Sequence, residues 1–505
     1  MLDIILGLGH QYTQLVTTRQ QTFPQKANPP HPRRFSRPHS CLDMEESNDR
    51  IKLNIGGKLF ETTATTLQSA GPESLLAALS IPAASNPSTF VDRDPELFSV
   101  LLTLLRSGHL PSSARQFHTQ DLVDEAIYYG IESRIRSALA PPPLLGFDAA
   151  LSTTIVPASD AVPTALCAGT DGSVWIAHSG QISAYGWNLT HAGTVRTHLE
   201  EISSLRRAWP EELAAIGSLD YPGLHFYDVS GACHVGTVHW SDPSDPRIYK
   251  ARVTAIAGGD SRSDPLFASF ECSHRENCIL AVDRETLQPV SEIGRQSGGA
   301  AKSAAPGKVV HVPGLGLLFV VSVSSGAFGY SGYMRLWDPR SGEAVWETSE
   351  PGGTGRSSRF GDSFADADVD GKEGLIYKVC WKSGDVGVAD LRRLGEGFDP
   401  WVYLEERSPA LRSAGGGENS VLRCYKEQVF VSRATGLEVW SKLDDEQGEE
   451  ERRYRRNFVD TEEDAKLGLI RRMEGGGDRL FVSREGVEGI QVWESSELSG
   501  SISLL

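Results

Sequence analysis

Hydrophobic and polar positions alternate where the chain first shows a regular pattern. The segment IKLNI at 51–55 places an apolar residue at every second position, and LFET at 59–62 forms a second short run. The pair Gly56–Gly57 lies between them. Because glycines adopt the positive φ angles of a tight two-residue turn, the pattern predicts a β-hairpin. We expect a helical stretch over about 71–80 and a short strand at 89–91.

Two later segments show the spacing of amphipathic helices. The first has Asp94 as a candidate N-cap, Pro95 at the first helical position and Gly108 as its end. In the second, Thr119 is the expected N-cap. The positions expected to face inward in this second helix are Leu122, Val123, Ala126 and Ile127. These elements predict a small α/β domain over 45–140, followed by a Pro-rich linker at 141–150.

From residue 151 onward, short strand patterns repeat between Gly, Asp and Ser turns. An aromatic or aspartate ends most repeats, and the later of these positions recur every 50 to 55 residues. This period fits a four-stranded propeller blade with long loops. The sequence therefore predicts an all-β propeller over 151–505 with seven blades, in which 314–323 is a buried strand. The blade anchors are Trp187, Asp228, Asp283, Trp337, Asp338, Asp390, Trp440 and Trp493.

Composition narrows the class of protein. The 505 residues are 39% hydrophobic and carry a formal charge of -17, which argues against a broad nucleic-acid or anionic-membrane surface. No stretch reaches the roughly 18 apolar residues of a membrane helix. The seven cysteines are odd in number and irregularly spaced, which favours a reducing compartment. We expect a cytoplasmic protein, and the weakly basic PRRFSRP at 32–38 leaves a nuclear pool open.

The first 44 residues differ from the rest of the chain. They contain five Lys and Arg residues against two acidic ones, and they show no hydrophobic periodicity. We expect a disordered tail, or extraneous sequence upstream of a true start at Met44. An organelle transit peptide is the alternative, which the lack of a visible amphipathic helix disfavours.

No catalytic set of residues emerges, and we expect no cofactor and no metal. Cys272, His274 and Cys278 lack the second ligand pair of a structural zinc site. Asp366, Asp368 and Asp370 imitate the start of a calcium loop, but a solvated turn between blades is the better interpretation. The mixed-charge run at 444–466 predicts a long exposed loop. Its arginines around Tyr454 are a candidate site for binding an acidic peptide, although the flanking Glu449, Glu450 and Glu451 would compete for them.

Four motifs stand in the order and spacing of a known domain. They are IKLNIGG at 51–57, TTATTL at 62–67, FVDRDPELFSVLLTLLRSGHLP at 90–111 and LVDEAIYYGI at 122–131. Residues 49–135 therefore resemble a BTB/POZ domain of the potassium-channel-tetramerisation type. The remainder resembles the divergent WD40 or YVTN-like repeats that follow this domain in a group of plant proteins. The matching signature and oligomerisation residues are Gly56, Gly57, Phe90, Asp92, Arg93, Asp94 and Phe98.

The charged residues of this signature also have a local interpretation. Asp94 is explained by helix capping, and Arg93 could form an ion pair with Asp92 beside it. The resemblance gives them a second role, which is to hold the loop that organises the fold and the neighbouring subunits.

The resemblance implies a function. BTB proteins of this kind often act as substrate adaptors of cullin-3 RING ubiquitin ligases, with the BTB domain forming a homo-oligomer (tetramer or pentamer) and the propeller holding an unidentified protein substrate. The expected cullin surface includes the loop 81–88 with Ile81, together with Phe117 and Tyr128. Ordinary placement in the core or in a loop is the alternative for each. A scaffold that gathers signalling, trafficking or channel partners without ubiquitin transfer is the alternative function, and an enzymatic propeller is disfavoured.

Overall fold

The computed structural model describes the chain between residues 50 and 495, with gaps. The described residues are 50–81, 89–156, 161–208, 212–258, 264–272, 276–298, 303–326, 329–348, 363–395, 400–404, 419–433, 436–443, 454–460, 464 and 466–495. The predicted N-terminal tail at 1–44 therefore lies outside them.

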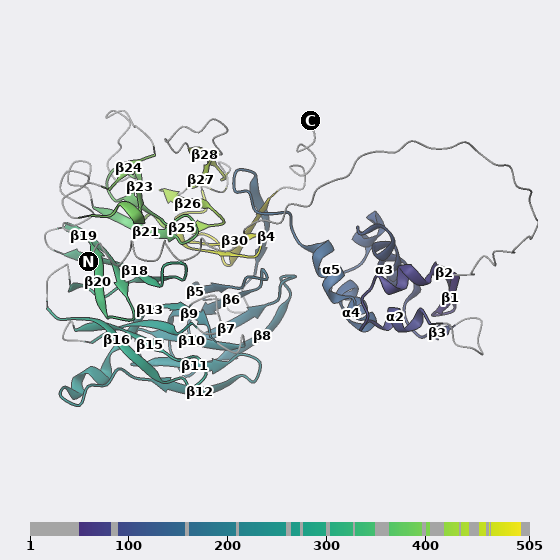
Figure 1. Cartoon of the computed structure of the whole chain (residues 1–505), viewed down its shortest axis with the longest axis horizontal. Coiled ribbons are helices and arrows are strands. Elements are labelled where there is room, and N and C mark those ends of the chain that lie inside the picture. The colour runs from purple at the N-terminus through teal and green to yellow at the C-terminus, as the bar shows by residue number, and fades with distance from the viewer. Residues whose placement is uncertain are drawn as a thin grey trace, which may run out of the picture. The chain divides into compact units, whose positions relative to one another are not determined.

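Within the described residues, a three-stranded sheet and five α-helices form the N-terminal domain (Figure 1). The strands are β1 (Arg50–Ile55), β2 (Lys58–Thr63) and β3 (Thr89–Val91), in the order β2-β1-β3 with β3 parallel to β1. The predicted hairpin is confirmed. Gly56 has φ +52°, and a Cβ there would lie 2.5 Å from the Arg93 carbonyl oxygen. Only glycine fits this turn without a backbone shift.

The helices are α1 (Ala64–Gln68), α2 (Leu75–Leu79), α3 (Pro95–Ser107), α4 (Thr119–Tyr129) and α5 (Glu132–Leu139), with a 3-10 turn η2 (Ser112–Gln116) before α4. The stretch expected over 71–80 is only α2, and the Thr-rich segment before it forms α1, which directly follows β2. Thr63 and Ser74 cap these two helices, because each side chain accepts a backbone N–H of the first turn.

The ends of α3 are as predicted, whereas α4 differs in two respects. The Asp94 side chain accepts the N–H groups of Glu96 and Leu97, and Gly108 ends α3 in the left-handed conformation. The N-cap of α4 is His118 rather than Thr119. Ile127, expected inside, is 52% exposed, while Tyr129 is buried. The buried face of α4 repeats every three or four residues from Leu122, and Ile127 falls just beyond it.

Seven four-stranded sheets form the propeller within the described residues, which confirms the predicted class and blade number. Blades 1 to 3 contain β5 (Pro163–Ala168), β6 (Val174–His178), β7 (Gln181–Tyr185), β8 (His191–Arg196); β9 (Ile202–Arg207), β10 (Leu213–Ser218), β11 (Leu224–Asp228), β12 (Cys233–Val238); β13 (Arg252–Gly258), β14 (Leu266–Glu271), β15 (Asn277–Val282), β16 (Pro289–Gln296). The 3-10 turn η3 (Pro246–Lys250) precedes β13.

Blades 4 to 7 continue the same order. Their strands are β17 (Lys308–Val312), β18 (Leu317–Gly326), β19 (Gly329–Asp338), β20 (Glu343–Glu347); β21 (Phe364–Asp370), β22 (Leu375–Cys380), β23 (Val386–Asp390), β24 (Val402–Tyr403); β25 (Leu422–Tyr425), β26 (Gln428–Arg433), β27 (Gly436–Lys442), β28 (Tyr454–Phe458); β29 (Ile470–Gly476), β30 (Arg479–Arg484), β31 (Ile490–Ser495), and β4 (Ala149–Ile155). The 3-10 turn η6 (Leu391–Arg393) follows β23. The predicted buried strand at 314–323 is confirmed as β18.

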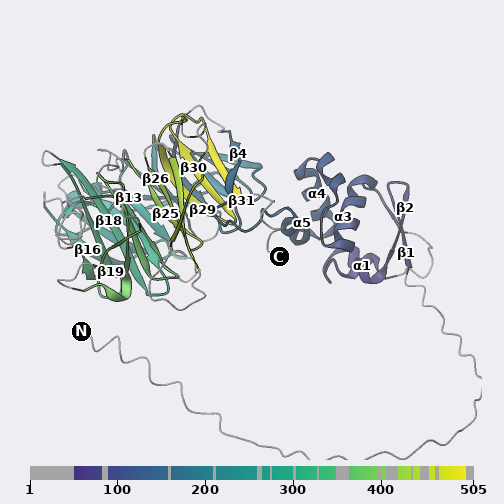
Figure 2. The same ribbon diagram turned by 90° about the horizontal axis from the view of Figure 1, so that it is seen from above.

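The first strand of the propeller closes the ring. β4 pairs antiparallel with β31 and so completes blade 7 with sequence from the other end of the domain (Figure 2). Each pair of adjacent blades encloses its own apolar cluster, including the pair formed by blades 7 and 1. Leu144, within the predicted linker, is buried in the cluster between blades 6 and 7. The ring is therefore held both by strand pairing and by apolar packing.

The blade anchors occupy one structural position, which is the end of the third strand in a blade. Asp228, Asp338 and Asp390 end β11, β19 and β23, and Asp283 directly follows β15. Each of these carboxylates accepts a backbone N–H two residues further on. The repeat in the sequence therefore marks the turn from the third to the fourth strand. Trp187, Trp337, Trp440 and Trp493 lie in or directly beside the same region.

Candidate protein-interaction surfaces

The predicted signature residues of the N-terminal domain divide into structural and exposed ones. Gly56 and Gly57 form the hairpin turn, and Asp94 caps α3. Phe98 is fully buried, with its ring centroid 5.0 Å from that of Phe60. Phe90, on the edge strand β3, is 59% exposed.

Arg93 joins the start of α3 to the end of α4. Its guanidinium pairs with the Glu125 carboxylate at 2.5 Å, and its Cζ lies 4.4 Å from the centroid of the Tyr128 ring. The hydrogen bond that the Arg93 guanidinium donates to Glu125 raises the pKa of Arg93. The expected pair with Asp92 is wrong, because Glu125 is buried and needs a cation more than the exposed Asp92 does.

Glu125 and Arg93 thus hold an aromatic side chain at the surface. Tyr128 is 44% exposed and has its ring stacked under a guanidinium that is itself fixed by a buried carboxylate. A rigid exposed aromatic of this kind loses little conformational entropy when a partner covers it. Sequence reasoning missed Glu125, whose only signal is an acidic residue on the apolar side of a helix.

The three residues expected on the cullin face differ in accessibility. Ile81 follows α2 and is 74% exposed, and Tyr128 is exposed as described. Phe117 is partly buried and packs against the domain core. The rest of the expected loop, 82–88, lies outside the described residues. Two of the three side chains are therefore available to a partner in this domain.

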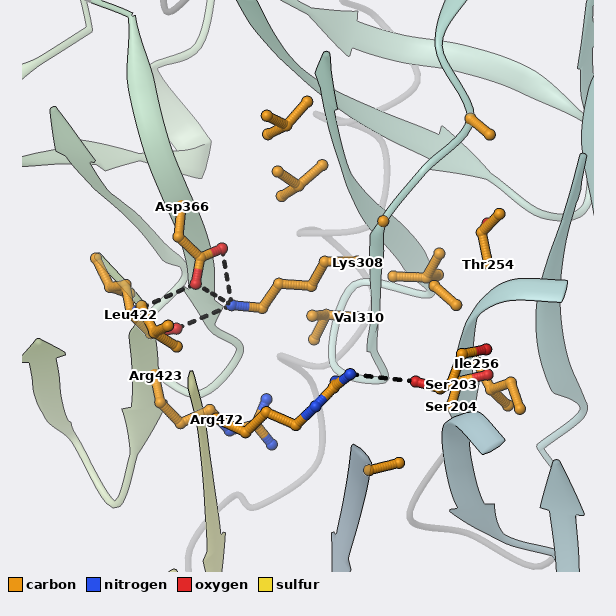
Figure 3. A pocket seen from close by; sticks show the side chains of 18 of the residues that line it. Ser203, Ser204, Thr254, Ile256, Lys308, Val310, Asp366, Leu422, Arg423 and Arg472 are labelled. Atoms are coloured by element: carbon orange, nitrogen blue, oxygen red, sulfur yellow. Dashed lines mark hydrogen bonds and ion pairs between the residues drawn. The ribbon is translucent and has the colours of Figure 1, made fainter. Parts of the chain in front are cut away.

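A second surface lies at one end of the propeller channel. The first strand of every blade contributes lining residues; these strands are β5, β9, β13, β17, β21, β25 and β29. The channel encloses about 970 Å³. Figure 3 shows apolar side chains such as Val310 and Ile256 beside charged ones that reach in from several blades.

Charged side chains of five blades form a continuous network in this channel. Lys308 Nζ lies 3.2 Å from Asp366 and 3.8 Å from Asp368, and it donates to the Leu422 carbonyl at 2.9 Å (Figure 3). Arg423 lies 3.6 Å from Asp368. Arg423 and Arg206 then share Glu474, at 3.1 Å and 2.5 Å. Positive and negative charges alternate along the network.

Burial and neighbouring cations have opposite effects on the pKa values of the carboxylates in the network. Burial raises the pKa of Asp366 despite the attraction of Lys308. Burial would also raise the pKa of Glu474, but Arg206 and Arg423 outweigh it and the pKa is lowered. Glu474 therefore stays ionised between its two arginines. Such pairs fix the geometry of the channel wall, and the loss of one partner leaves an uncompensated charge.

The predicted solvated turn at Asp366, Asp368 and Asp370 is wrong. All three lie on β21, and Asp368 is buried. The backbone N–H groups of Leu422 and Cys424 donate to Asp366 and Asp368, so these carboxylates join blade 5 to blade 6. Alternate positions of a strand point to one face, which directs both Asp366 and Asp368 towards β25.

The mixed-charge run at 444–466 is not a loop throughout. Tyr454–Phe458 forms β28, the outer strand of blade 6. Arg456 pairs with Glu438 at 2.8 Å, so it is already engaged within the blade. Residues 444–453, including Arg452 and Arg453 of the proposed peptide grip, lie outside the described residues.

Two of the three soft ligands in the suggested zinc cluster are buried in blade 3. Cys272 and Cys278 are buried, and His274 lies outside the described residues. Burial raises the pKa of the Cys278 thiol, which therefore stays protonated. Among the described residues no group of three or more His, Cys, Asp or Glu side chains is arranged to hold a metal ion. Likewise, no helix in the described ranges is long and apolar enough to span a membrane.

Blade 2 carries a histidine cluster that the sequence did not suggest. The ring of His198 lies 5.1 Å from those of both His225 and His234, measured between centroids. Thr237 Oγ1 lies 3.1 Å from a ring nitrogen of His225 and of His234. Burial and the neighbouring histidines lower the pKa of His225 to about 4. His225 and His234 come together because β11 and β12 pair, and His198 joins them from the segment between β8 and β9.

Comparison with known proteins covers both domains. A family model of the BTB/POZ domain matches residues 51–138, and a model of an At2g24240-like C-terminal β-propeller matches residues 157–495. The BTB/POZ domain-containing protein At5g41330 of Arabidopsis thaliana is 35% identical over 471 residues, covering 90% of this chain and 97% of that protein.

Two further relatives show how far the similarity extends. The BTB/POZ domain-containing protein At2g24240 of Arabidopsis thaliana is 27% identical over 470 residues, which are 90% of this chain and 99% of that protein. The BTB/POZ domain-containing protein KCTD21 of Homo sapiens is 35% identical over 96 residues, which are 18% of this chain and 36% of that protein. The plant relatives are thus similar over both domains.

Proposed function

Because the chain belongs to the family of plant BTB/POZ proteins with an At2g24240-like C-terminal β-propeller, we propose that it is a substrate adaptor of a cullin-3 RING ubiquitin ligase. In this role the BTB domain binds the cullin and a second copy of itself, and the propeller holds the substrate. The adaptor performs no bond-breaking step. It raises the local concentration of the substrate near the ubiquitin-loaded enzyme, and an oligomer adds avidity.

The observation that carries the proposal is the exposed apolar surface of the BTB domain. Ile81 and Tyr128 are both solvent-accessible there, and Tyr128 is held in place by Arg93 and Glu125. Burying such side chains against a partner is favourable by about 25 cal/mol for each Å² of apolar area. The tetramerisation-type resemblance of this domain supports the cullin and another BTB domain as the proposed partners.

Substitutions at Ile81 and Tyr128 test the proposal with little risk to the fold. We expect Ile81→Asp with Tyr128→Ala to weaken binding of the cullin-3 N-terminal domain at least tenfold, as measured by isothermal titration calorimetry on the full chain. Phe117 is unsuitable, because it packs against the core and its loss would disturb folding. Val290→Asp, at an equally exposed apolar position on β16, is the matched control and should leave binding unchanged.

Two outcomes contradict the proposal. Undetectable binding of the cullin-3 domain by the unsubstituted chain would leave the coarser role, an oligomeric scaffold. Tight binding that survives the double substitution would place the cullin on a different surface.

A further inference from the structure

The charged network of the channel contains as many cations as carboxylates. Three cations, Lys308, Arg423 and Arg206, alternate with three carboxylates, Asp366, Asp368 and Glu474. Each member lies within 4 Å of an opposite charge, so the charges of the network compensate one another without a ligand. Its role is to connect the blades.

Arg472 is a further cation in the same channel, and it is not a member of this network. It lies on β29, two positions before Glu474, and its Nη2 donates to the Ser203 backbone carbonyl at 3.4 Å (Figure 3). Among the described residues no carboxylate lies within ion-pair distance of its guanidinium. The adjacent Arg471 is different, since it pairs with Glu485.

The surroundings of Arg472 leave its charge incompletely compensated. Partial withdrawal from water lowers the pKa of Arg472, and the attraction of Glu474 and Glu201 does not offset this effect. Glu474 is already shared by Arg206 and Arg423. A guanidinium with a single long hydrogen bond to a neutral carbonyl retains several free N–H donors. These donors border the open channel.

We propose that the channel of the propeller binds an acidic segment of a partner protein, and that Arg472 receives a carboxylate or phosphate group of that segment. The inference rests on the proposed function, because it names the chemistry of the substrate that the adaptor would hold. A planar guanidinium forms two parallel hydrogen bonds with either group.

The size of the channel favours a peptide over a free anion. About 970 Å³ is far more than one phosphate fills, and the apolar walls at Val310 and Ile256 suit neighbouring side chains of an entering loop. The chain as a whole carries -17, so it repels acidic peptides over most of its surface. Retention of an acidic peptide would therefore report a local site rather than general attraction.

The test uses the full chain and degenerate octapeptide pools that differ only in one fixed central residue. The fixed residue is Glu, Asp, phosphoserine, Gln or Lys, and binding is measured by fluorescence anisotropy. We expect the three acidic pools to bind more tightly than the Gln and Lys pools. Arg472→Gln should weaken the acidic pools at least tenfold, since a hydrogen bond to a charged group contributes about 1.5–3 kcal/mol. Arg196→Gln, at an exposed position of the outer strand β8, should change binding less than twofold.

Stability separates a binding role of Arg472 from a structural one. Arg472→Gln should leave the thermal unfolding midpoint unchanged or raised. Arg423→Gln should lower it, because Asp368 and Glu474 would each lose one of their two cations. A loss of stability in Arg472→Gln equal to that in Arg423→Gln would overturn the proposal.

Binding controls complete the test. Equal binding of all five pools, or acid-selective binding that survives Arg472→Gln, would contradict the assignment. Inorganic phosphate that binds Arg472 as tightly as the phosphoserine pool would show a site for a free anion and overturn the peptide proposal. No cullin is present in these assays, so their failure is independent of a failure of the cullin experiment.

Discussion

Glu125 is the residue on which the exposed edge of the BTB domain depends. It is 2% exposed, and Arg93 is the cation that compensates it. Arg93 in turn lies over Tyr128, so a buried charge determines where an exposed aromatic points. Removing the cation should therefore affect both the stability of the domain and the presentation of Tyr128.

The first prediction concerns this pair. Arg93→Met should lower the free energy of unfolding of the BTB domain by about 3 kcal/mol, because Glu125 would stay buried without a partner. Adding Glu125→Leu should recover most of that loss. All ten tryptophans lie beyond residue 174. Urea unfolding followed by helical circular dichroism therefore reports the BTB domain, and tryptophan fluorescence reports the propeller. A change in stability below about 0.5 kcal/mol in the single variant would contradict the prediction.

The second prediction concerns pH and His225. Its pKa is about 4 in the folded protein, against an ordinary value of about 6.5 when unfolded. Between these values the unfolded chain binds a proton that the folded chain does not, so stability falls as the pH falls from 6.5 towards 4. The total loss is about 3 kcal/mol.

His225→Asn removes this titration and keeps a nitrogen near Thr237. The variant should lose about 2 kcal/mol less than the unsubstituted chain between pH 7.5 and pH 5, as measured by urea unfolding with tryptophan fluorescence. An identical pH dependence in both proteins would show that His225 is not the group responsible.

Among the elements, β4 determines whether the propeller closes. It supplies the fourth strand of blade 7, and β31 would otherwise present an unpaired edge. The family model of the propeller starts at residue 157, which is after β4. The structural domain therefore begins earlier than the matched segment, at Ala149 or before, and Leu144 adds packing in front of it.

The third prediction follows from this placement. A fragment of residues 141–505 should fold into a monodisperse propeller, whereas 157–505 should aggregate or unfold at a clearly lower temperature. The reason is that the shorter fragment exposes the edge of β31 and part of the cluster between blades 7 and 1. Light scattering and thermal unfolding make the comparison. Equal stability of the two fragments would contradict the role given to β4.

At this scale the sequence could predict those features that depend on contacts between residues close together in the chain. Asp94 and Gly108 mark the ends of α3 because a cap bonds to backbone a few residues away. Asp283 and Asp390 mark blade turns for the same reason. The seven-bladed ring followed from the repetition of these turns.

The sites could not be predicted in the same way, because their partners are distant in sequence. Lys308 meets Asp366 58 residues later, and Arg206 meets Glu474 268 residues later. These pairs depend on the register between blades, which no local pattern specifies. The same limit applies to Arg93 and Glu125, where the nearer Asp92 was the wrong choice.

The whole molecule combines a BTB/POZ domain with a β-propeller. The BTB domain presents exposed apolar side chains, and the propeller presents a charged channel. If several copies assemble through the first domain, several channels act on one partner or on several partners at once. Linkage of this kind strengthens binding without any new contact.

The most direct test of this account is the mass of the protein in solution with and without the cullin-3 N-terminal domain. Size-exclusion chromatography with light scattering on residues 44–505 is the measurement. We predict an oligomer that shifts to a stoichiometric complex when the cullin domain is added. An oligomer whose mass is unchanged by the cullin domain would contradict the adaptor role, and a monomer would contradict assembly through the BTB domain as well.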